Sequence, residues 1–197
     1  MSETLEQPPT KELTPVQIRA DEMRERMAHK TQTGKWEVYL NSPITEEENL
    51  QRKEIIAREP RSVLVVCSAG KNRSKFIAHI LNKRGYKAVN IGAGNEKGGA
   101  KPLLESDILE SKPEAIICMD EHVKENFVRQ VEKLEIAEEI EDTPIRTIGF
   151  GDNSAFYETN PERKITRILE LEDYVGKVLD RLGFVKVQHS ATPNSLK

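Results

Sequence analysis

Two patterns of hydrophobic positions divide the chain near residue 61. Before that point, apolar residues are sparse and are mixed with charged ones. After it, short apolar runs alternate with longer stretches in which apolar residues recur at helical spacing. Continuous runs of β-branched residues and leucine are typical of strands that are buried on both faces of a parallel sheet. The pattern therefore predicts an α/β domain from residue 61 to residue 184.

Four strands and four helices are expected in this domain. The strands are expected over residues 62–66 (SVLVV), 87–91 (KAVNI), 115–119 (AIICM) and 145–150 (IRTIGF). The helices are expected over residues 74–84, 102–110, 121–140 and 163–182. Gly85 and Gly183 would end the first and the last helix. Short links between these elements predict right-handed crossovers, and hence a four-stranded parallel sheet with helices on both faces.

The first 60 residues predict a mainly helical extension rather than part of the sheet. Residues 1–15 contain three prolines among polar residues and predict a disordered arm. Residues 16–30 could form a charged helix, and residues 36–40 (WEVYL) a short strand. Thr45 and Glu48 have the spacing of a capping box, which predicts that a further helix begins there. At the other end of the chain, residues 185–197 are expected to be a flexible tail.

Composition narrows the class of protein. Of the 197 residues, 37% are hydrophobic and 32% are charged, with a formal net charge of −3, whereas nucleic-acid binders usually carry a basic surplus. No apolar run approaches the ~20 residues of a membrane span, and the first ten residues lack a signal-peptide core. The two cysteines, Cys67 and Cys118, are too few for a disulfide framework. We therefore expect a cytoplasmic protein without nucleic-acid or membrane partners, and its oligomeric state stays open.

The strongest chemical signal is the loop CSAGKNRS, residues 67–74, between the first expected strand and its helix. Such a turn points several backbone N–H groups at one place, and the helix dipole adds to their attraction for an anion. The same field would lower the pKa of Cys67, and Arg73 could bind two oxygens of a phosphate. Gly70 permits a positive φ, and Ser74 could donate a hydrogen bond to the sulfur.

Together these residue types predict attack of Cys67 on a phosphate ester. Taken singly, each residue would favour a structural interpretation, with a buried cysteine at a strand end and a solvated arginine on the first helical turn. The residues expected to surround the phosphate, besides Arg73, are Ser68, Ala69, Gly70, Lys71, Asn72 and Ser74. The site would therefore lie where ligands bind in parallel sheets, beyond the carboxyl ends of the strands.

The motif Cys-x5-Arg-Ser is the signature of cysteine-dependent phosphatases, and residues 63–94 resemble the opening of the low-molecular-weight phosphotyrosine phosphatase superfamily. The segment is especially similar to the branch that contains the phosphatase of the RNA polymerase II C-terminal domain. The similarity lies in the Cys-Ser…Asn-Arg-Ser loop, an Ala-His pair at residues 78–79, a Lys-Arg-Gly end at residues 83–85 and a Gly-x-Gly after the second strand. Those families usually have Asn where this chain has Gly70, so a side-chain brace of the loop is expected to be missing.

The resemblance implies a general acid in the loop after the last strand. The run FGDN occupies that place and implies Asp152 as the acid, although an Asp that caps a turn would give the same run. Met119-Asp120 resembles a Met-Asp pair of the family, and we expect Asp120 to open the next helix rather than to brace neighbouring loops. Tyr157 could line the pocket wall.

The expected activity is that of a phosphoprotein phosphatase that needs no metal or cofactor and forms a phosphocysteine intermediate. Whether it would act on phosphotyrosine or on phosphoserine and phosphothreonine stays open. Two alternatives also stay open: an arsenate reductase of the same fold, which needs a resolving thiol, and a phosphoprotein-binding module with weak catalysis.

Two expectations concern the place of the extension on the domain. The helix that begins near Thr45 is expected at the amino ends of the strands, opposite the active site. Residues 36–40 are expected to dock on the domain, with a lid over the pocket as the rival idea.

Overall fold

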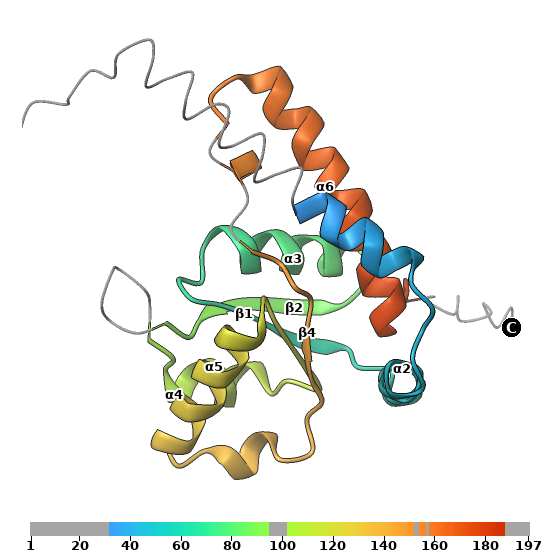
Figure 1. The fold of residues 1–197 in the computed structure, drawn as a ribbon. Coiled ribbons are helices and arrows are strands. Elements are labelled where there is room, and N and C mark those ends of the chain that lie inside the picture. Colours follow the sequence, from blue (N-terminus) through green and yellow to red (C-terminus); the bar gives the residue numbers. More distant parts are fainter. Residues whose placement is uncertain (1–31, 95–101, 152–153, 157, 188–197) are drawn as a thin grey trace, which may run out of the picture.

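The computed structural model of the protein is shown in Figure 1, and it describes residues 32–94, 102–151, 154–156 and 158–187. The arm expected over residues 1–15, the helix expected over residues 16–30 and residues 188–197 of the expected tail lie outside the described residues.

A four-stranded, all-parallel sheet forms the centre of the fold, as the sequence predicts. Its strands lie in the order β2-β1-β3-β4 and span Lys87–Gly92 (β2), Ser62–Cys67 (β1), Ala115–Cys118 (β3) and Ile145–Thr147 (β4). In the register of the sheet, Cys67 lies beside Gly92 of β2 and Val66 lies beside Cys118 of β3. Because β1 is central and its last five residues are buried, its sequence is an unbroken apolar run.

Helices cover both faces of the sheet (Figure 1). One face carries α3 (Asn72–Lys83) and α6 (Pro161–Leu182), and the other carries α4 (Glu105–Ser111) and α5 (Glu121–Lys133). Gly85 and Gly183 follow α3 and α6 with φ values of +95° and +98°, as expected of glycines that end helices. Within the described ranges, no helix combines the length and the apolar character that a bilayer span requires.

Four elements are shorter than the sequence predicts. The helix expected over residues 102–110 is α4, which begins only at Glu105, and the third strand ends at Cys118 instead of residue 119. The fourth strand ends at Thr147 instead of residue 150, because Gly149 has a φ of +64° and takes the chain out of the extended conformation. The expected helix over residues 121–140 is divided at Glu135, which has a φ of +57°, into α5 and a 3-10 helix over Ala137–Ile140.

The N-terminal extension contains two helices in its described part. The first, over residues 32–41, is called the extension helix below, and the second is α2 (Glu46–Arg58). The capping box predicted at the start of α2 is confirmed: the Thr45 hydroxyl accepts from the Glu48 backbone N–H at 3.1 Å, and the Glu48 carboxylate accepts from the Thr45 N–H at 2.9 Å.

The prediction of a strand over residues 36–40 is wrong, because this segment is helical. Trp36, Val38 and Leu40 alternate as a strand would, but Trp36 and Leu40 are also four residues apart and share one face of a helix. That face packs on the domain, with Trp36 buried, whereas Val38 is 72% exposed. The expected docking of this segment on the domain is therefore observed, in a different secondary structure.

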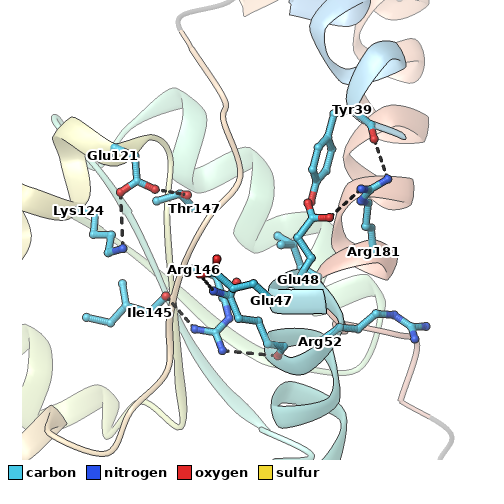
Figure 2. A pocket seen from close by; sticks show the side chains of 12 residues that line it. Tyr39, Glu47, Glu48, Arg52, Glu121, Lys124, Ile145, Arg146, Thr147 and Arg181 are labelled. Atoms are coloured by element: carbon cyan, nitrogen blue, oxygen red, sulfur yellow. Dashed lines mark hydrogen bonds and ion pairs between the residues drawn. The ribbon is translucent and has the colours of Figure 1, made fainter. Parts of the chain in front are cut away.

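Arg181 of α6 holds the end of the extension helix (Figure 2). Its guanidinium donates to the backbone carbonyls of Tyr39 at 2.7 Å and Ser42 at 2.9 Å, and it pairs with the carboxylate of Glu48 at 2.9 Å. The last carbonyls of a helix lack partners within that helix. Arg181 therefore satisfies groups that the extension would otherwise leave unpaired where it meets α6.

Candidate functional site

Cys67 ends β1, and the loop that leads to α3 surrounds its sulfur. The Sγ atom lies 3.0 Å from the Ser74 hydroxyl oxygen and accepts a hydrogen bond from the Gly70 backbone N–H at 3.1 Å. Because Ser74 is fully buried, packing fixes the position of its hydroxyl. The contact between hydroxyl and sulfur that the sequence predicts is therefore present.

The two cysteines differ in acidity. Burial alone would raise the pKa of Cys67, but hydrogen bonds from the Ser74 hydroxyl and from backbone N–H groups of the loop outweigh it, so that pKa lies below its ordinary value. Burial raises the pKa of Cys118 to about 12. Cys67 therefore loses its proton at a lower pH than Cys118 does, and the thiolate is the nucleophilic form.

The loop needs glycine at position 70. Gly70 has a φ of +63°, and a Cβ there would lie 2.7 Å from the backbone nitrogen of Gly92 and 2.9 Å from the carbonyl carbon of Ile91. The Gly70 carbonyl accepts a hydrogen bond from the side-chain amide of Asn90 at 2.9 Å. Asn90 therefore supplies a side-chain brace that sequence reasoning expected to be missing. In the sequence, Asn90 is visible only as a polar residue within the run KAVNI, and this position does not indicate which backbone group it bonds to.

Arg73 lies in the first turn of α3 and is braced from two directions. Its Nη1 donates to the Asp120 carboxylate at 3.1 Å and to the Phe150 carbonyl at 3.0 Å. The Asp120 carboxylate also accepts from the Val123 backbone N–H at 2.9 Å and so caps α5. Asp120 therefore opens α5, as expected, and in addition braces the guanidinium, the role that the sequence interpretation placed second.

The remaining loop residues expected to bind phosphate lie where an anion could reach them. Ser68, Ala69 and Gly70 are partly exposed, and Lys71 and Asn72 are exposed at the start of α3. The first backbone N–H groups of a helix lack partners within it and carry its positive dipole end. The arrangement at the carboxyl end of β1 can therefore stabilise an anion close to the sulfur of Cys67.

Asp152, expected as the general acid, and Tyr157 lie outside the described residues. The chain that leads to Asp152 is described, and it passes the site, since the carbonyl that Arg73 binds belongs to Phe150. Phe156 is half-buried, and its ring packs against Phe76 with centroids 5.5 Å apart.

A second group of charged side chains lines a cavity of about 270 Å³ between α2, β4 and α6, apart from the Cys67 loop (Figure 2). Arg146 of β4, which lines the cavity, pairs with Glu54 of α2, and Glu121 of α5 accepts from the Thr147 hydroxyl at 2.7 Å. The lining holds four basic side chains (Arg52, Lys124, Arg146 and Arg181) and three acidic ones (Glu47, Glu48 and Glu121), so its charges nearly balance. The ion pair of Arg146 with Glu54 connects α2 to the domain.

Comparison with known proteins assigns no family to this chain: no family model matches it, and searches of curated proteins and of solved structures find no match either. Among the described residues, no three His, Cys, Asp or Glu side chains gather in a way that could hold a metal ion. The geometry around Cys67 and the motifs of the sequence are therefore what indicates a function for this protein.

Proposed function

We propose that this protein is a cysteine-dependent phosphoprotein phosphatase of the low-molecular-weight type. The observation that carries the proposal is the acidified thiol of Cys67 in the same loop as a braced arginine, Arg73, at the carboxyl end of a central parallel strand. A nucleophilic thiolate beside a fixed guanidinium suits attack on a phosphate monoester. The resemblance of residues 63–94 to the low-molecular-weight superfamily supports the same chemistry.

In the first step, the Cys67 thiolate attacks phosphorus, an S–P bond forms, and the bond from phosphorus to the leaving oxygen breaks. Arg73 and the backbone N–H groups of the loop bind the phosphoryl oxygens, whose charge builds up in the transition state. Asp152 protonates the leaving oxygen in this scheme.

In the second step, water attacks the phosphocysteine. Asp152 accepts a proton from that water, a P–O bond forms, and the S–P bond breaks to return the thiolate and release inorganic phosphate. The Ser74 hydroxyl, 3.0 Å from the sulfur, stabilises the leaving thiolate.

A phosphorylated protein is the proposed substrate, with the identity of the phosphorylated residue left open. A phosphotyrosine slot needs aromatic walls, and the Phe156 ring packs mainly against Phe76 and Phe150. Arsenate reduction requires a resolving thiol. Cys118 suits that role poorly because burial raises its pKa to about 12.

Turnover of a generic aryl phosphate tests the mechanism. Wild-type protein should hydrolyse it, and Cys67→Ser should abolish hydrolysis while inorganic phosphate still binds. Cys118→Ala is the matched control and should retain activity, since Cys118 has no role in the proposed reaction. Rapid-quench mass spectrometry of the wild-type protein should show a phosphate adduct on Cys67.

Three outcomes would contradict the proposal. Activity that persists in Cys67→Ser would show that Cys67 is not the nucleophile. Phosphopeptide binding without hydrolysis by wild-type protein would favour the binding module. Thiol-dependent arsenate reduction that is lost in Cys118→Ala favours the reductase. Rates on matched phosphotyrosine and phosphoserine peptides would then show which residue the enzyme prefers.

A further inference from the structure

The backbone of residues 148–151, called the strap below, links β4 to the site and is bonded on both sides. On one side, the N–H groups of Ile148 and Phe150 donate to carbonyls at the end of β3, at 3.1 Å and 2.6 Å. On the other side, the Phe150 carbonyl accepts from Arg73. The strap is therefore the backbone that holds the phosphate-binding arginine of the proposed function.

Two side chains of the extension helix complete the hydrogen bonding of the strap. The Gln32 amide donates to the Gly149 carbonyl at 2.9 Å and accepts from the Gly151 N–H at 3.1 Å. It thus bonds to the residues on either side of Phe150. Gln32 is 8% exposed, so water competes weakly for these bonds.

Trp36 fixes the same segment one helical turn further along. Its indole N–H donates to the Ile148 carbonyl at 3.2 Å, and its ring centroid lies 5.1 Å from that of Phe150. Phe150 is fully buried and also packs against Phe76 of α3, at 6.2 Å. The extension helix therefore constrains both the backbone and the side chain of Phe150.

We propose that Gln32 and Trp36 are positioning residues for Arg73, acting through the strap. This inference rests on the proposed function, because it assumes that Arg73 binds the phosphoryl group. Without the two side chains, the carbonyls of Ile148 and Gly149 and the N–H of Gly151 would lose their hydrogen bonds, and the Phe150 backbone between them would shift. A displacement of about 1 Å at a binding group can reduce catalysis by ~100-fold, so a modest shift of the Phe150 carbonyl would be measurable at Arg73.

The test compares Gln32→Leu, which keeps a similar volume and removes both amide bonds, with Trp36→Phe, which keeps an aromatic ring but removes the bond to Ile148 and part of the ring packing. Inorganic phosphate is the probe, and its affinity is read from the protection of Cys67 against alkylation. Both variants should bind phosphate more weakly, by about tenfold for Gln32→Leu, the size expected when hydrogen bonds to a charged group are misaligned. Val38→Ala, an exposed position on the same helix, is the matched control and should bind as wild type does.

Further readouts separate positioning from mere stability. The pH dependence of Cys67 alkylation without phosphate should not change in Gln32→Leu, because Ser74 and Gly70 hold the sulfur and the strap does not. Thermal unfolding of each variant sets a temperature at which all of them are folded. A variant pair that melts earlier but binds phosphate as tightly as wild type overturns the inference.

The experiment also separates this inference from the proposed function. If wild-type protein binds phosphate through Arg73 but does not hydrolyse esters, the phosphatase proposal fails, and weaker binding in Gln32→Leu still supports the positioning role. If wild-type protein is an active phosphatase and both variants bind phosphate as tightly as it does, the positioning role is wrong and the proposed function stands. If wild type does not bind phosphate, both fail.

Discussion

At the sulfur of Cys67, burial and hydrogen bonding act in opposite directions on the pKa. Burial disfavours the thiolate, while the Ser74 hydroxyl and backbone N–H groups favour it and prevail. Because the pKa is lowered, the thiolate forms at a lower pH than in a free cysteine, and it is lost when the pH falls below this shifted value.

Ser74→Ala should move the alkylation profile of Cys67 to higher pH. Loss of a hydrogen bond to a charged acceptor raises the pKa of the thiol, so alkylation at a pH below that pKa slows by roughly tenfold. The rate of iodoacetamide labelling between acidic and neutral pH measures the change. Ser68→Ala is the control, because the Ser68 hydroxyl lies 3.5 Å from Arg73 Nη2 and is not a partner of the sulfur. Coincident profiles for Ser74→Ala and wild type would contradict this account.

Two glycines should respond to alanine in opposite ways. Gly70→Ala places a Cβ 2.7 Å from a backbone nitrogen at a φ of +63°, so we expect a loss of about 1–3 kcal/mol in the free energy of unfolding and weaker phosphate binding. At Gly34, inside the extension helix, a Cβ meets no described atom within 4 Å, and alanine should stabilise by about 0.5–1 kcal/mol. Denaturant unfolding of both variants measures the contrast. Equal effects would show that local backbone geometry does not decide the outcome.

Among the elements, those with local signals were predicted and those set by distant contacts were not. The start of α2 depends on Thr45 and Glu48, three residues apart, and the end of α6 depends on the glycine beside it. The extension helix was predicted as a strand because its apolar positions fit both periods. What decides between the two is the surface that Trp36 meets, more than 100 residues away in the chain.

The candidate site divides in the same way. The roles of Gly70 and Ser74 follow from a strand, a loop and a helix that are adjacent in sequence, and the sequence predicted them. The braces on this loop come from other elements: Asn90 from β2 and the Phe150 carbonyl from the strap. A side-chain amide gives no indication in sequence of which backbone group it will meet, so Gln32 and Asn90 could not be found from the sequence alone.

Arg181→Met should release the C-terminal end of the extension helix. The substitution leaves the carbonyls of Tyr39 and Ser42 and the carboxylate of Glu48 without their shared donor, and we expect the free energy of unfolding to fall by about 2–3 kcal/mol. Lys177→Met is the control on the same helix, where an exposed ion pair contributes little. Chemical denaturation measures both, and an Arg181→Met protein as stable as wild type would rule out this role.

For the whole molecule, the extension covers the α6 side of the domain and at the same time contacts the strap. Deletion of residues 1–44 would expose Phe150 and the ring of Tyr174, which lies 6.4 Å from Trp36. We expect both the melting temperature and the phosphate affinity to fall. A lid would behave differently: its removal would raise or lower the turnover of a small aryl phosphate several-fold and leave the melting temperature unchanged. Calorimetry and turnover on the same truncated protein distinguish the two.

The short connection between the extension helix and α2 has a consequence for how docking can be measured. Only residues 42–45 separate the two helices, and a tether that short keeps a segment near its surface at an effective concentration on the order of millimolar. Once residues 1–44 are removed, that surface becomes a receptor for a free peptide of residues 32–44. Added in excess, the peptide should restore phosphate affinity in a saturable way. The concentration that restores half of the affinity gives the intrinsic dissociation constant of the docked helix, which the intact chain conceals because the tether keeps that surface occupied.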